Sequence, residues 1–545
     1  HYPIMLKASS GGGGKGMRIC FTDAELKDNF VLSQNEARNF FGDDRLLLEQ
    51  YIQNPHHIEF QVLADGDDVV VFPERECSLQ RRNQKILEES PSVLLTNETR
   101  QTMARQVKAL CQRVGYASAG TVEFMVLRSQ EFFFLEMNTR LQVEHPITEL
   151  VASPVGNVDL VEGMISIAAG HGIPPSILNL SPDDSSDQIT VPYIGHAMEA
   201  RVYAEDAQRG FLPSTGPLVK YQEPSLQRDG MTIRVDSGVT EGSLISQYYD
   251  PMVSKLIVHG NSREEAIHGL KQALDQYVIQ GVQCNTSFLS DLLRHPRVVD
   301  GDTPTNFIEQ EYPNGFQGVQ LTSTEKLELA ALVAHLHPEK DQHASTVIPV
   351  VVCLGGMFGD AYRVTQTSSD GDGTIFTVQS LAKSEDEEES PPMSISMDSL
   401  TSKGTAIFDC VLNGDQKFIQ VLGRSVMGEV EFKMHGANVT ALVFRENEYE
   451  LCRLHMKPAK DTHDSNVLAS PMPGTLVKFS VQEGDEVLDG QELCVVEAMK
   501  MQNVLHSTRS GIVSKIFVEA GSSVRADQVI LKFAQEQTGS QEQSA

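Results

Sequence analysis

The chain has 545 residues, of which 74 are aspartate or glutamate and 44 are lysine or arginine, so its formal net charge is -30. One hydrophobic core rarely serves so long a chain, and the length predicts roughly three or four domains. The acidic balance argues against nucleic acid and anionic membranes as partners, and no apolar run reaches the roughly 18 residues that a membrane-spanning helix needs.

The chain opens on an apolar stretch, residues 2–6, that predicts a strand, and no initiator methionine precedes it. We therefore expect the sequence to begin inside a domain. Lys7 and a glycine-rich segment, residues 11–16, follow the strand. The bare backbone amides of such a segment can close over a polyphosphate. A mobile linker has the same composition, however, and the glycine spacing fits neither the P-loop nor the dinucleotide-binding fingerprint.

Two apolar runs, residues 121–126 and 132–137, predict neighbouring strands in an α/β or α+β catalytic region. Glu136 and Asn138 are two residues apart, so a strand turns both toward one face, where they could join Glu123 around a cation. Oxygen ligands of this type suit Mg²⁺ or Mn²⁺. Surface glutamates would give the same pattern, but the run that follows is too polar for a core strand. It contains Asn138, Arg140, Gln142, Glu144 and His145.

Further along, two capping boxes predict helices. Ser262 with Glu265 begins the first helix, and Thr322 with Glu325 begins the second. Short β-rich runs then dominate from about residue 347 to 452, and they predict an antiparallel barrel or sandwich.

The last part of the chain is an internal repeat, in which residues 474–493 align with residues 511–530 without a gap. Two similar β halves would form a flattened barrel, with the segment between them, residues 497–503, as a hairpin at its end. Lys500 lies at the tip of this hairpin, within the sequence Glu-Ala-Met-Lys-Met, which is the biotin acceptor motif. A solvated turn lysine or a lipoyl-bearing lysine would occupy the same place, but methionine on both sides favours biotin.

Four segments together resemble biotin carboxylase, an ATP-grasp enzyme, namely residues 7–18, 76–85, 136–148 and 248–256. Residues 466–535 resemble the biotin carrier domain found with it. Between these regions, the segment that begins at residue 312 resembles the subunit-contact domain of α subunits that act on propionyl-CoA. The chain is thus identified as a member of the biotin-dependent acyl-CoA carboxylase family, which implies a multidomain α+β fold.

The resemblance also implies domain boundaries. An ATP-grasp domain without its N-terminal subdomain is expected at residues 1–155, and a carboxylase C-terminal subdomain at residues 156–310. A contact domain with a central helix and an antiparallel β-barrel is expected at residues 311–456. A linker at residues 457–467, a biotinyl flattened β-barrel at residues 468–535 and a disordered tail at residues 536–545 are expected after it. The subdomain that is missing carries part of the ATP pocket, so we expect little carboxylase activity from this polypeptide alone. The acidic run 385–389 is expected to be a solvated loop.

Site residues follow from the same resemblance. ATP would contact Lys7, Gly13, Gly14, Glu49, His57 and Gln80, and Mg²⁺ or Mn²⁺ would bind Glu123, Glu136 and Asn138. The pocket for bicarbonate and biotin would include Gln142 and Val143, and the biotin itself would be attached to Lys500. The catalytic residues would be Glu144, Arg140, Lys85 and Arg201. Among them, Glu144 would deprotonate bicarbonate and Arg201 would stabilise the biotin enolate.

The implied reaction is ATP- and bicarbonate-dependent carboxylation of biotin on the chain's own carrier domain. The carboxyl group would then pass to propionyl-CoA on a separate carboxyltransferase β subunit, giving methylmalonyl-CoA. The resemblance further implies an α6β6 dodecamer, a biotin protein ligase as a partner, and a location in the mitochondrial matrix of a eukaryote or otherwise in the cytoplasm. Methylcrotonyl-CoA carboxylases share every catalytic motif and remain an alternative, as does a non-catalytic biotinylated carrier or scaffold.

Overall fold

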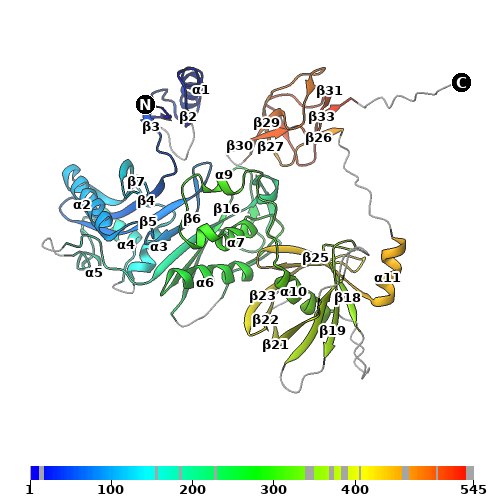
Figure 1. Cartoon of the computed structure of the whole chain (residues 1–545). Coiled ribbons are helices and arrows are strands. Elements are labelled where there is room, and N and C mark those ends of the chain that lie inside the picture. Colours follow the sequence, from blue (N-terminus) through cyan, green and yellow to red (C-terminus); the bar gives the residue numbers. More distant parts are fainter. Residues whose placement is uncertain are drawn as a thin grey trace.

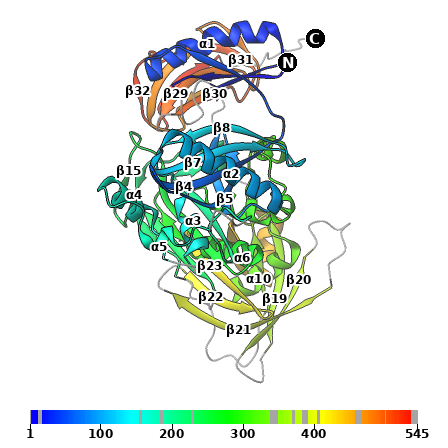
Figure 2. The ribbon, with the colours of Figure 1, turned by 90° about the vertical axis from the view of Figure 1, so that its left-hand side faces the viewer.

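The computed structural model describes residues 2–10, 17–153, 157–182, 187–225, 230–337, 349–367, 373–381, 391–403, 407–456, 466–498 and 501–534. Within them the chain forms a large body of sheets and helices, an eight-stranded barrel and a small C-terminal β domain (Figure 1), so the predicted multidomain α+β fold is confirmed. The C-terminal β domain (orange to red) lies above the large body and the barrel (yellow-green) extends below it (Figure 2). None of the described helices combines the length and the apolar character needed to cross a membrane.

A separate three-stranded antiparallel sheet comes first, with strand order β2-β1-β3. The predicted first strand is present as β1 (Ile4–Ala8), which pairs with β2 (Arg18–Cys20) and β3 (Leu46–Gln50). Helix α1 (Asp23–Phe41) connects β2 to β3 and ends at Gly42, whose φ of 69° is one that glycine adopts without strain.

An antiparallel sheet of eight strands forms the centre of the large body, in the order β14-β16-β9-β6-β5-β4-β7-β8. Its strands are β4 (His56–Asp65), β5 (Val69–Arg81), β6 (Gln84–Ser90), β7 (Ala117–Val126), β8 (Phe132–Asn138), β9 (His196–Tyr203), β14 (Thr232–Ser237) and β16 (Met252–Gly260). The predicted neighbours at residues 121–126 and 132–137 are β7 and β8, which pair as expected. Strand β6 pairs with β9, with Leu87 and Ala200 as Cα partners, although two strands and four helices lie between β6 and β9 in sequence.

Helices cover both faces of this sheet. Helices α2 (Asn97–Val114) and α6 (Arg263–Gln276) pack on one face, and α3 (His145–Ala152) and α4 (Leu160–Ala168) pack on the other. The shorter helices of the body are α5 (Pro175–Leu178), α7 (Thr286–Arg294), α8 (Pro296–Val299) and α9 (Phe307–Glu311). Its short strands are β10 (Glu205–Asp206), β11 (Leu212–Pro213), β12 (Gly216–Pro217), β13 (Lys220–Gln222), β15 (Leu244–Ile245) and β17 (Val278–Gln280).

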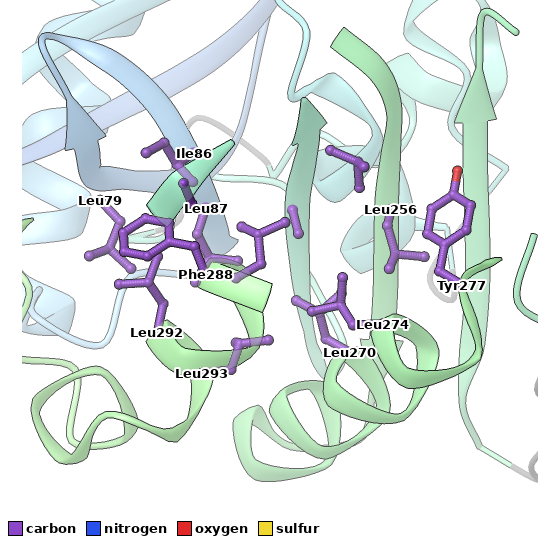
Figure 3. Close-up of a cluster of buried hydrophobic side chains, with 14 of the residues drawn as sticks. Leu79, Ile86, Leu87, Leu256, Leu270, Leu274, Tyr277, Phe288, Leu292 and Leu293 are labelled. Carbon is purple, nitrogen blue, oxygen red and sulfur yellow. The ribbon is translucent and has the colours of Figure 1, made fainter. Parts of the chain in front are cut away.

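The two faces of the sheet differ in chemistry because side chains alternate along each strand. In β4, Ile58 belongs to the apolar cluster beneath α2, and the adjacent residue Glu59 therefore faces α3. Figure 3 shows the apolar cluster beside α6, where Leu270 and Leu274 lie next to Leu256 of β16. The face toward α2 and α6 thus holds most of the apolar core, and the face toward α3 is free to carry polar groups.

The two predicted capping boxes have different outcomes. At α10 (Ser323–Leu336) the box is complete, because Thr322 and Glu325 exchange both hydrogen bonds. At α6 the Ser262 hydroxyl accepts from the Glu265 amide, but the Glu265 carboxylate accepts from the amide of Asn261. That box is therefore only half formed, since the turn before the helix offers a different amide to the carboxylate.

A closed antiparallel barrel follows α10, as the β-rich pattern predicted. Its strands are β18 (Val350–Leu354), β19 (Asp360–Thr367), β20 (Thr374–Ser380), β21 (Met393–Lys403), β22 (Ile407–Leu412), β23 (Asp415–Arg424), β24 (Val430–Met434) and β25 (Ala437–Arg445). Leu329 and Leu332 of α10 share one buried cluster with Val352, Phe376 and Phe432 of the barrel, so this helix supplies part of the barrel's core. Helix α11 (Glu446–His455) follows, and the acidic run 385–389 lies outside the described residues.

The C-terminal β domain consists of two four-stranded sheets, β26-β33-β31-β28 and β30-β29-β27-β32. Its strands are β26 (Val467–Ala469), β27 (Gly474–Phe479), β28 (Glu486–Val487), β29 (Glu492–Ala498), β30 (Met501–His506), β31 (Gly511–Ile516), β32 (Ser523–Val524) and β33 (Val529–Phe533). The predicted repeat is confirmed, because β27 and β28 in the first half correspond to β31 and β32 in the second. Strands β29 and β30 pair up to Ala498 and Met501, and Lys500 itself lies outside the described residues.

One buried ion pair of the large sheet gives a prediction about stability. Glu89 of β6 is 6% exposed and accepts hydrogen bonds from Arg263 of α6 at 2.6 and 3.1 Å, while its distance to His196 Nε2 is 2.7 Å. Although burial opposes the effect, these partners lower the pKa of Glu89 to about 2. Glu89→Gln should reduce the free energy of unfolding by about 3 kcal/mol at neutral pH, because it leaves a buried cation without its anion.

The pH dependence of this loss is also fixed. A carboxylate whose pKa is lowered by folding stabilises the protein above its unfolded pKa of about 4.3, and the contribution is lost as the pH falls toward about 2. Urea unfolding of both proteins between about pH 3 and pH 7 would measure the difference. Glu450→Gln, which alters an exposed pair with Arg453, is the control and should change stability by less than about 0.5 kcal/mol. Equal effects of the two substitutions would contradict the prediction.

Candidate active site

A row of ionisable side chains crosses the face of the large sheet that α3 covers. Strand register places Glu136 opposite Glu123, Glu123 opposite Glu59, and Glu59 opposite Arg75. Three of these four residues, Glu59, Arg75 and Glu123, are at most 4% exposed. Buried charges are stable only when they are paired, so the row requires cations among its carboxylates.

Lys85 of β6 supplies the central positive charge. Its Nζ donates to Glu59 Oε2 at 2.7 Å, to Glu144 Oε1 at 2.5 Å and to Gln142 Oε1 at 2.9 Å, and it lies 3.7 Å from Glu123 Oε1. Burial opposes the effect, but the anionic groups around Lys85 raise its pKa well above the usual value. Lys85 therefore stays charged and contacts residues of two other strands and of the loop before α3.

Glu144 sits between two cations at the start of α3 and is 1% exposed. Its Oε1 accepts from Lys85, and its Oε2 accepts from Arg201 Nη2 of β9 at 2.9 Å. Burial alone would raise the pKa of Glu144, but Lys85 and Arg201 outweigh it and hold the pKa well below the usual range. Arg201 also donates from Nε to Glu88 Oε1 at 2.6 Å. The structure thus brings together Lys85, Glu144 and Arg201, three of the four residues to which the resemblance assigns catalytic roles.

The predicted metal ligands also meet. The amide nitrogen of Asn138 donates to Glu123 Oε1 at 2.7 Å and to Glu136 Oε1 at 3.5 Å. The Asn138 amide directs its nitrogen at the two carboxylates. A half-turn of the amide group would present its oxygen instead, and the three residues would then offer the hard oxygen donors that Mg²⁺ and Mn²⁺ prefer, so the residue types fit such an ion. A ligand atom of Glu123 also lies within 4.8 Å of those of His57 and Glu59, and all four carboxylate oxygens of these two glutamates already have hydrogen-bond partners among the protein side chains.

The residues predicted to contact ATP lie beside this group. Lys7 of β1 donates to Glu136 Oε2 at 3.0 Å and lies 3.9 Å from Glu49 Oε2, so the first sheet is tied to the large one. The Gln80 amide nitrogen donates to the Cys77 carbonyl and to His57 Nδ1, both at 2.7 Å. His57 Nδ1 is then an acceptor, and its Nε2 carries the proton that it donates to Glu123 Oε2 at 2.9 Å. Gly13 and Gly14 lie outside the described residues.

Arg140 is the predicted catalytic residue that the structure does not bring into this cluster. Its side chain is exposed, and its Nη1 donates to the Leu141 carbonyl at 3.3 Å. The neighbouring residues of the loop point inward. Gln142 donates to Glu123 Oε1 at 2.7 Å, and the Val143 carbonyl accepts from Lys255 Nζ at 2.9 Å. Arg140 therefore faces solvent and not the buried cluster.

Sequence reasoning missed three buried members of the site, Glu59, Arg75 and Glu88. Arg75 donates to Glu59 Oε1 at 2.7 Å and to Thr148 of α3 at 3.0 Å, so it ties the sheet to the helix above it. The signal that could have found Glu59 is its place between two apolar residues of β4, Ile58 and Phe60. A charged residue in such an alternating run faces a side of the sheet other than the apolar core.

Comparisons with known proteins identify relatives of most parts of the chain. Residues 1–175 match the family of the carbamoyl-phosphate synthase L chain ATP-binding domain, residues 199–310 match the biotin carboxylase C-terminal domain, and residues 466–533 match the biotin-requiring enzyme family. The propionyl-CoA carboxylase alpha chain of Ruegeria pomeroyi is 41% identical over 98% of this chain and 78% of its own length, and the mitochondrial one of Homo sapiens is 41% identical over 96% and 69%. The methylcrotonoyl-CoA carboxylase subunit alpha of Mus musculus is 33% identical over 98% and 72%.

Solved structures give the same result for the first part of the chain. The biotin carboxylase domain of the Hydrogenobacter thermophilus 2-oxoglutarate carboxylase has a TM-score of 0.52 at 41% identity, over 57% of this chain and 64% of its own. The biotin carboxylase of Campylobacter jejuni has a TM-score of 0.52 at 37% identity, over 57% and 65%. This chain therefore spans somewhat less than two thirds of those two chains. Its relatives and its matching domains together show that the chain belongs to the propionyl-CoA carboxylase alpha chain family of biotin-dependent carboxylases.

Proposed function

We propose that this chain is the α subunit of a propionyl-CoA carboxylase, which uses ATP and bicarbonate to carboxylate biotin on its own Lys500. The observation that carries the proposal is the buried carboxylate of Glu144, held between Lys85 and Arg201 in a chain that also contains a biotin-type domain. The Hydrogenobacter thermophilus relative was solved with MgADP and bicarbonate, which supports the same reactants here. The carboxyl group would pass to propionyl-CoA on a separate β subunit, giving methylmalonyl-CoA.

The site residues account for activation of bicarbonate. Glu144 is ionised and accepts the bicarbonate proton, so the oxygen that attacks the γ-phosphate of ATP becomes a better nucleophile. Lys85 and Gln142 hold the anion beside this base, and the guanidinium of Arg201 compensates the negative charge that develops. Their positions are fixed before the reactants arrive, because each is already hydrogen-bonded to a neighbouring strand or loop.

The nucleotide is held by a second group of residues. Lys7, Glu49, His57 and Gln80 surround the place where ATP would bind, and a Mg²⁺ or Mn²⁺ ion held by Glu123, Glu136 and Asn138 would neutralise phosphate charge when bound. Biotin, when attached to Lys500, supplies the ring nitrogen that carries the carboxyl group. The tether raises the local concentration of biotin at the site without any new contact.

Partners follow from the division of labour in this family. We assign the barrel, within residues 311–456, to contact with the carboxyltransferase β subunit in an α6β6 assembly, and Lys500 to modification by a biotin protein ligase. In a eukaryote the location would be the mitochondrial matrix, in line with the mitochondrial relative of Homo sapiens. A methylcrotonyl-CoA carboxylase is the second candidate, supported by a relative at 33% identity, against 41% for the propionyl-CoA carboxylases. A non-catalytic scaffold is disfavoured by the buried network that joins Lys85, Glu144 and Arg201.

Removal of the proposed base gives the most direct test. Glu144→Gln in the full-length biotinylated protein should lower bicarbonate-dependent ATP hydrolysis by about 10²- to 10⁴-fold, because the proton acceptor is lost. Nucleotide binding, measured by calorimetry, should persist. Glu162→Gln, an exposed glutamate of α4, is the control and should retain normal turnover. Normal turnover by Glu144→Gln would exclude Glu144 as the base.

The biotin attachment can be tested separately. Lys500→Arg should abolish avidin binding after expression with a biotin ligase, and mass spectrometry of the peptide that carries Lys500 should show the mass of biotin and not that of lipoate. The matched control is Lys515→Arg, which changes an exposed lysine of the same domain and should leave avidin binding intact. Avidin binding by Lys500→Arg would place the modification elsewhere.

Substrate preference decides between the two carboxylase candidates. The full-length α subunit, reconstituted with the β subunit that co-purifies with it, should carboxylate propionyl-CoA with a higher kcat/KM than 3-methylcrotonyl-CoA. The reverse preference would keep the biotin chemistry and transfer the chain to the methylcrotonyl-CoA carboxylases.

A further inference from the structure

Glu199 is a fully buried carboxyl group for which the described residues provide no hydrogen-bond donor. It lies in β9, is 0% exposed, and neither of its two oxygens has a partner. Its Cα partner on the neighbouring strand is Glu88 of β6, which is also 0% exposed and has one oxygen, Oε2, without a partner. Residues directly opposite in an antiparallel sheet have Cβ atoms about 4.5–5.5 Å apart. Two carboxylates so close in a dry site cannot both be ionised cheaply.

Arg201, the cation that is hydrogen-bonded to one member of this pair, is also shared with a third carboxylate. Arg201 follows Glu199 by two residues, so both side chains lie on the same face of β9. Its Nε donates to Glu88 Oε1 at 2.6 Å, and its Nη2 donates to Glu144 Oε2 at 2.9 Å. Glu88 therefore has a cationic donor, and Glu199 has none.

The other charged groups on this face are engaged in the same way. Lys255 of β16 donates to the Val143 carbonyl at 2.9 Å and lies 3.0 Å from Asp236 Oδ2. On α3, which covers this face, His145 lies 2.8 Å from the Gln142 carbonyl through Nδ1, and Glu149 accepts from Arg234 at 2.7 Å. None of these contacts provides a donor to Glu199.

We propose that Glu199 is a positioning residue that carries a proton in the working enzyme and, as a neutral carboxyl group beside Glu88, keeps the charge of Arg201 available to the anionic reactants. Burial and the nearby Glu88 raise the pKa of Glu199 well above its usual value, in agreement with this assignment. Burial also raises the pKa of Glu88, but Arg201 opposes that rise, so the proton of the pair belongs on Glu199.

The role of this proton rests on the proposed function, in which Arg201 compensates negative charge during biotin carboxylation. With Glu199 neutral, Arg201 is shared between two carboxylates, Glu88 and Glu144. Ionisation of Glu199 would add a third negative charge on the same face. The guanidinium would then be drawn toward the sheet and would stabilise the reactants less.

A stability measurement tests the proton without any turnover. A carboxyl group whose pKa is raised by folding stabilises the protein below its unfolded pKa of about 4.3, and this contribution is lost as the pH rises through the folded pKa. Glu199→Gln removes the titration, so its midpoint of thermal unfolding should rise relative to the native protein as the pH increases from about 5 to about 8.5. Glu89→Gln, on the adjacent strand and the other face, should show the opposite trend at low pH, because the pKa of Glu89 is lowered to about 2.

A second variant separates the loss of the titrating group from any effect that the new amide of Glu199→Gln has on packing. Glu199→Leu replaces the carboxyl group by an apolar one of similar size and should show the same relative gain with rising pH. If both variants instead lose stability relative to the native protein as the pH rises, Glu199 is ionised in the folded state and the proposal is overturned.

The positioning role is tested by the pH profile of kcat/KM for bicarbonate in the full-length biotinylated protein. Glu199→Gln should move the alkaline limb of the profile to higher pH, because the proton that the native enzyme loses cannot be lost from an amide. Glu88→Gln should move the alkaline limb to lower pH, because the neighbouring carboxylate that raises the pKa of Glu199 is then gone. An unmoved alkaline limb overturns the positioning role. If the native protein carries the proton by the stability test yet carboxylates no biotin, the proposed function fails and the proton assignment stands.

Discussion

The rest of the site depends on the ammonium group of Lys85, because it compensates carboxylates that the sheet has buried. Its Nζ lies within hydrogen-bonding distance of Glu59, Gln142 and Glu144, which come from a strand and from the loop before α3. Removing a single buried charge leaves its partners unpaired, which costs more than the pair contributes when both are present. The position of the loop therefore depends on one side chain of β6, and the arrangement is stable only as a whole.

The same strands build the core and the site, because alternation sends successive side chains to opposite faces. Leu87 of β6 packs beneath α6, while its neighbour Glu88 accepts from Arg201 on the face beneath α3. Glu89 then returns to the first face, where it pairs with Arg263. Apolar packing on one side thus fixes the backbone that positions the charges on the other. Catalysis by preorganised charge requires this rigidity, because groups that reorganise during the reaction lose their advantage.

The parts of the site that sequence could predict are local ones. Glu136 and Asn138 share a strand, so their spacing placed them on one face, and the structure confirms that they meet Glu123. The pairing of Glu88 with Glu199 across the sheet was not predicted, because it depends on β6 lying beside β9, and no local pattern determines the order of strands that are distant in sequence. Arg140 shows the converse limit, since a residue in a polar run can turn outward when the chain leaves the strand.

The charge network also limits how the anionic reactants can bind. Lys85 and Arg201 are both engaged by Glu144 before any reactant arrives, so a bound anion has to share these donors with the internal carboxylate. Sharing weakens ground-state binding, but it would favour the proposed step, in which Glu144 accepts a proton and loses its ion pairs with both cations. Each cation would then keep one carboxylate partner, Glu59 for Lys85 and Glu88 for Arg201, and would be more available to the developing negative charge. Binding energy withheld from the ground state and expressed in the transition state increases the rate rather than the affinity.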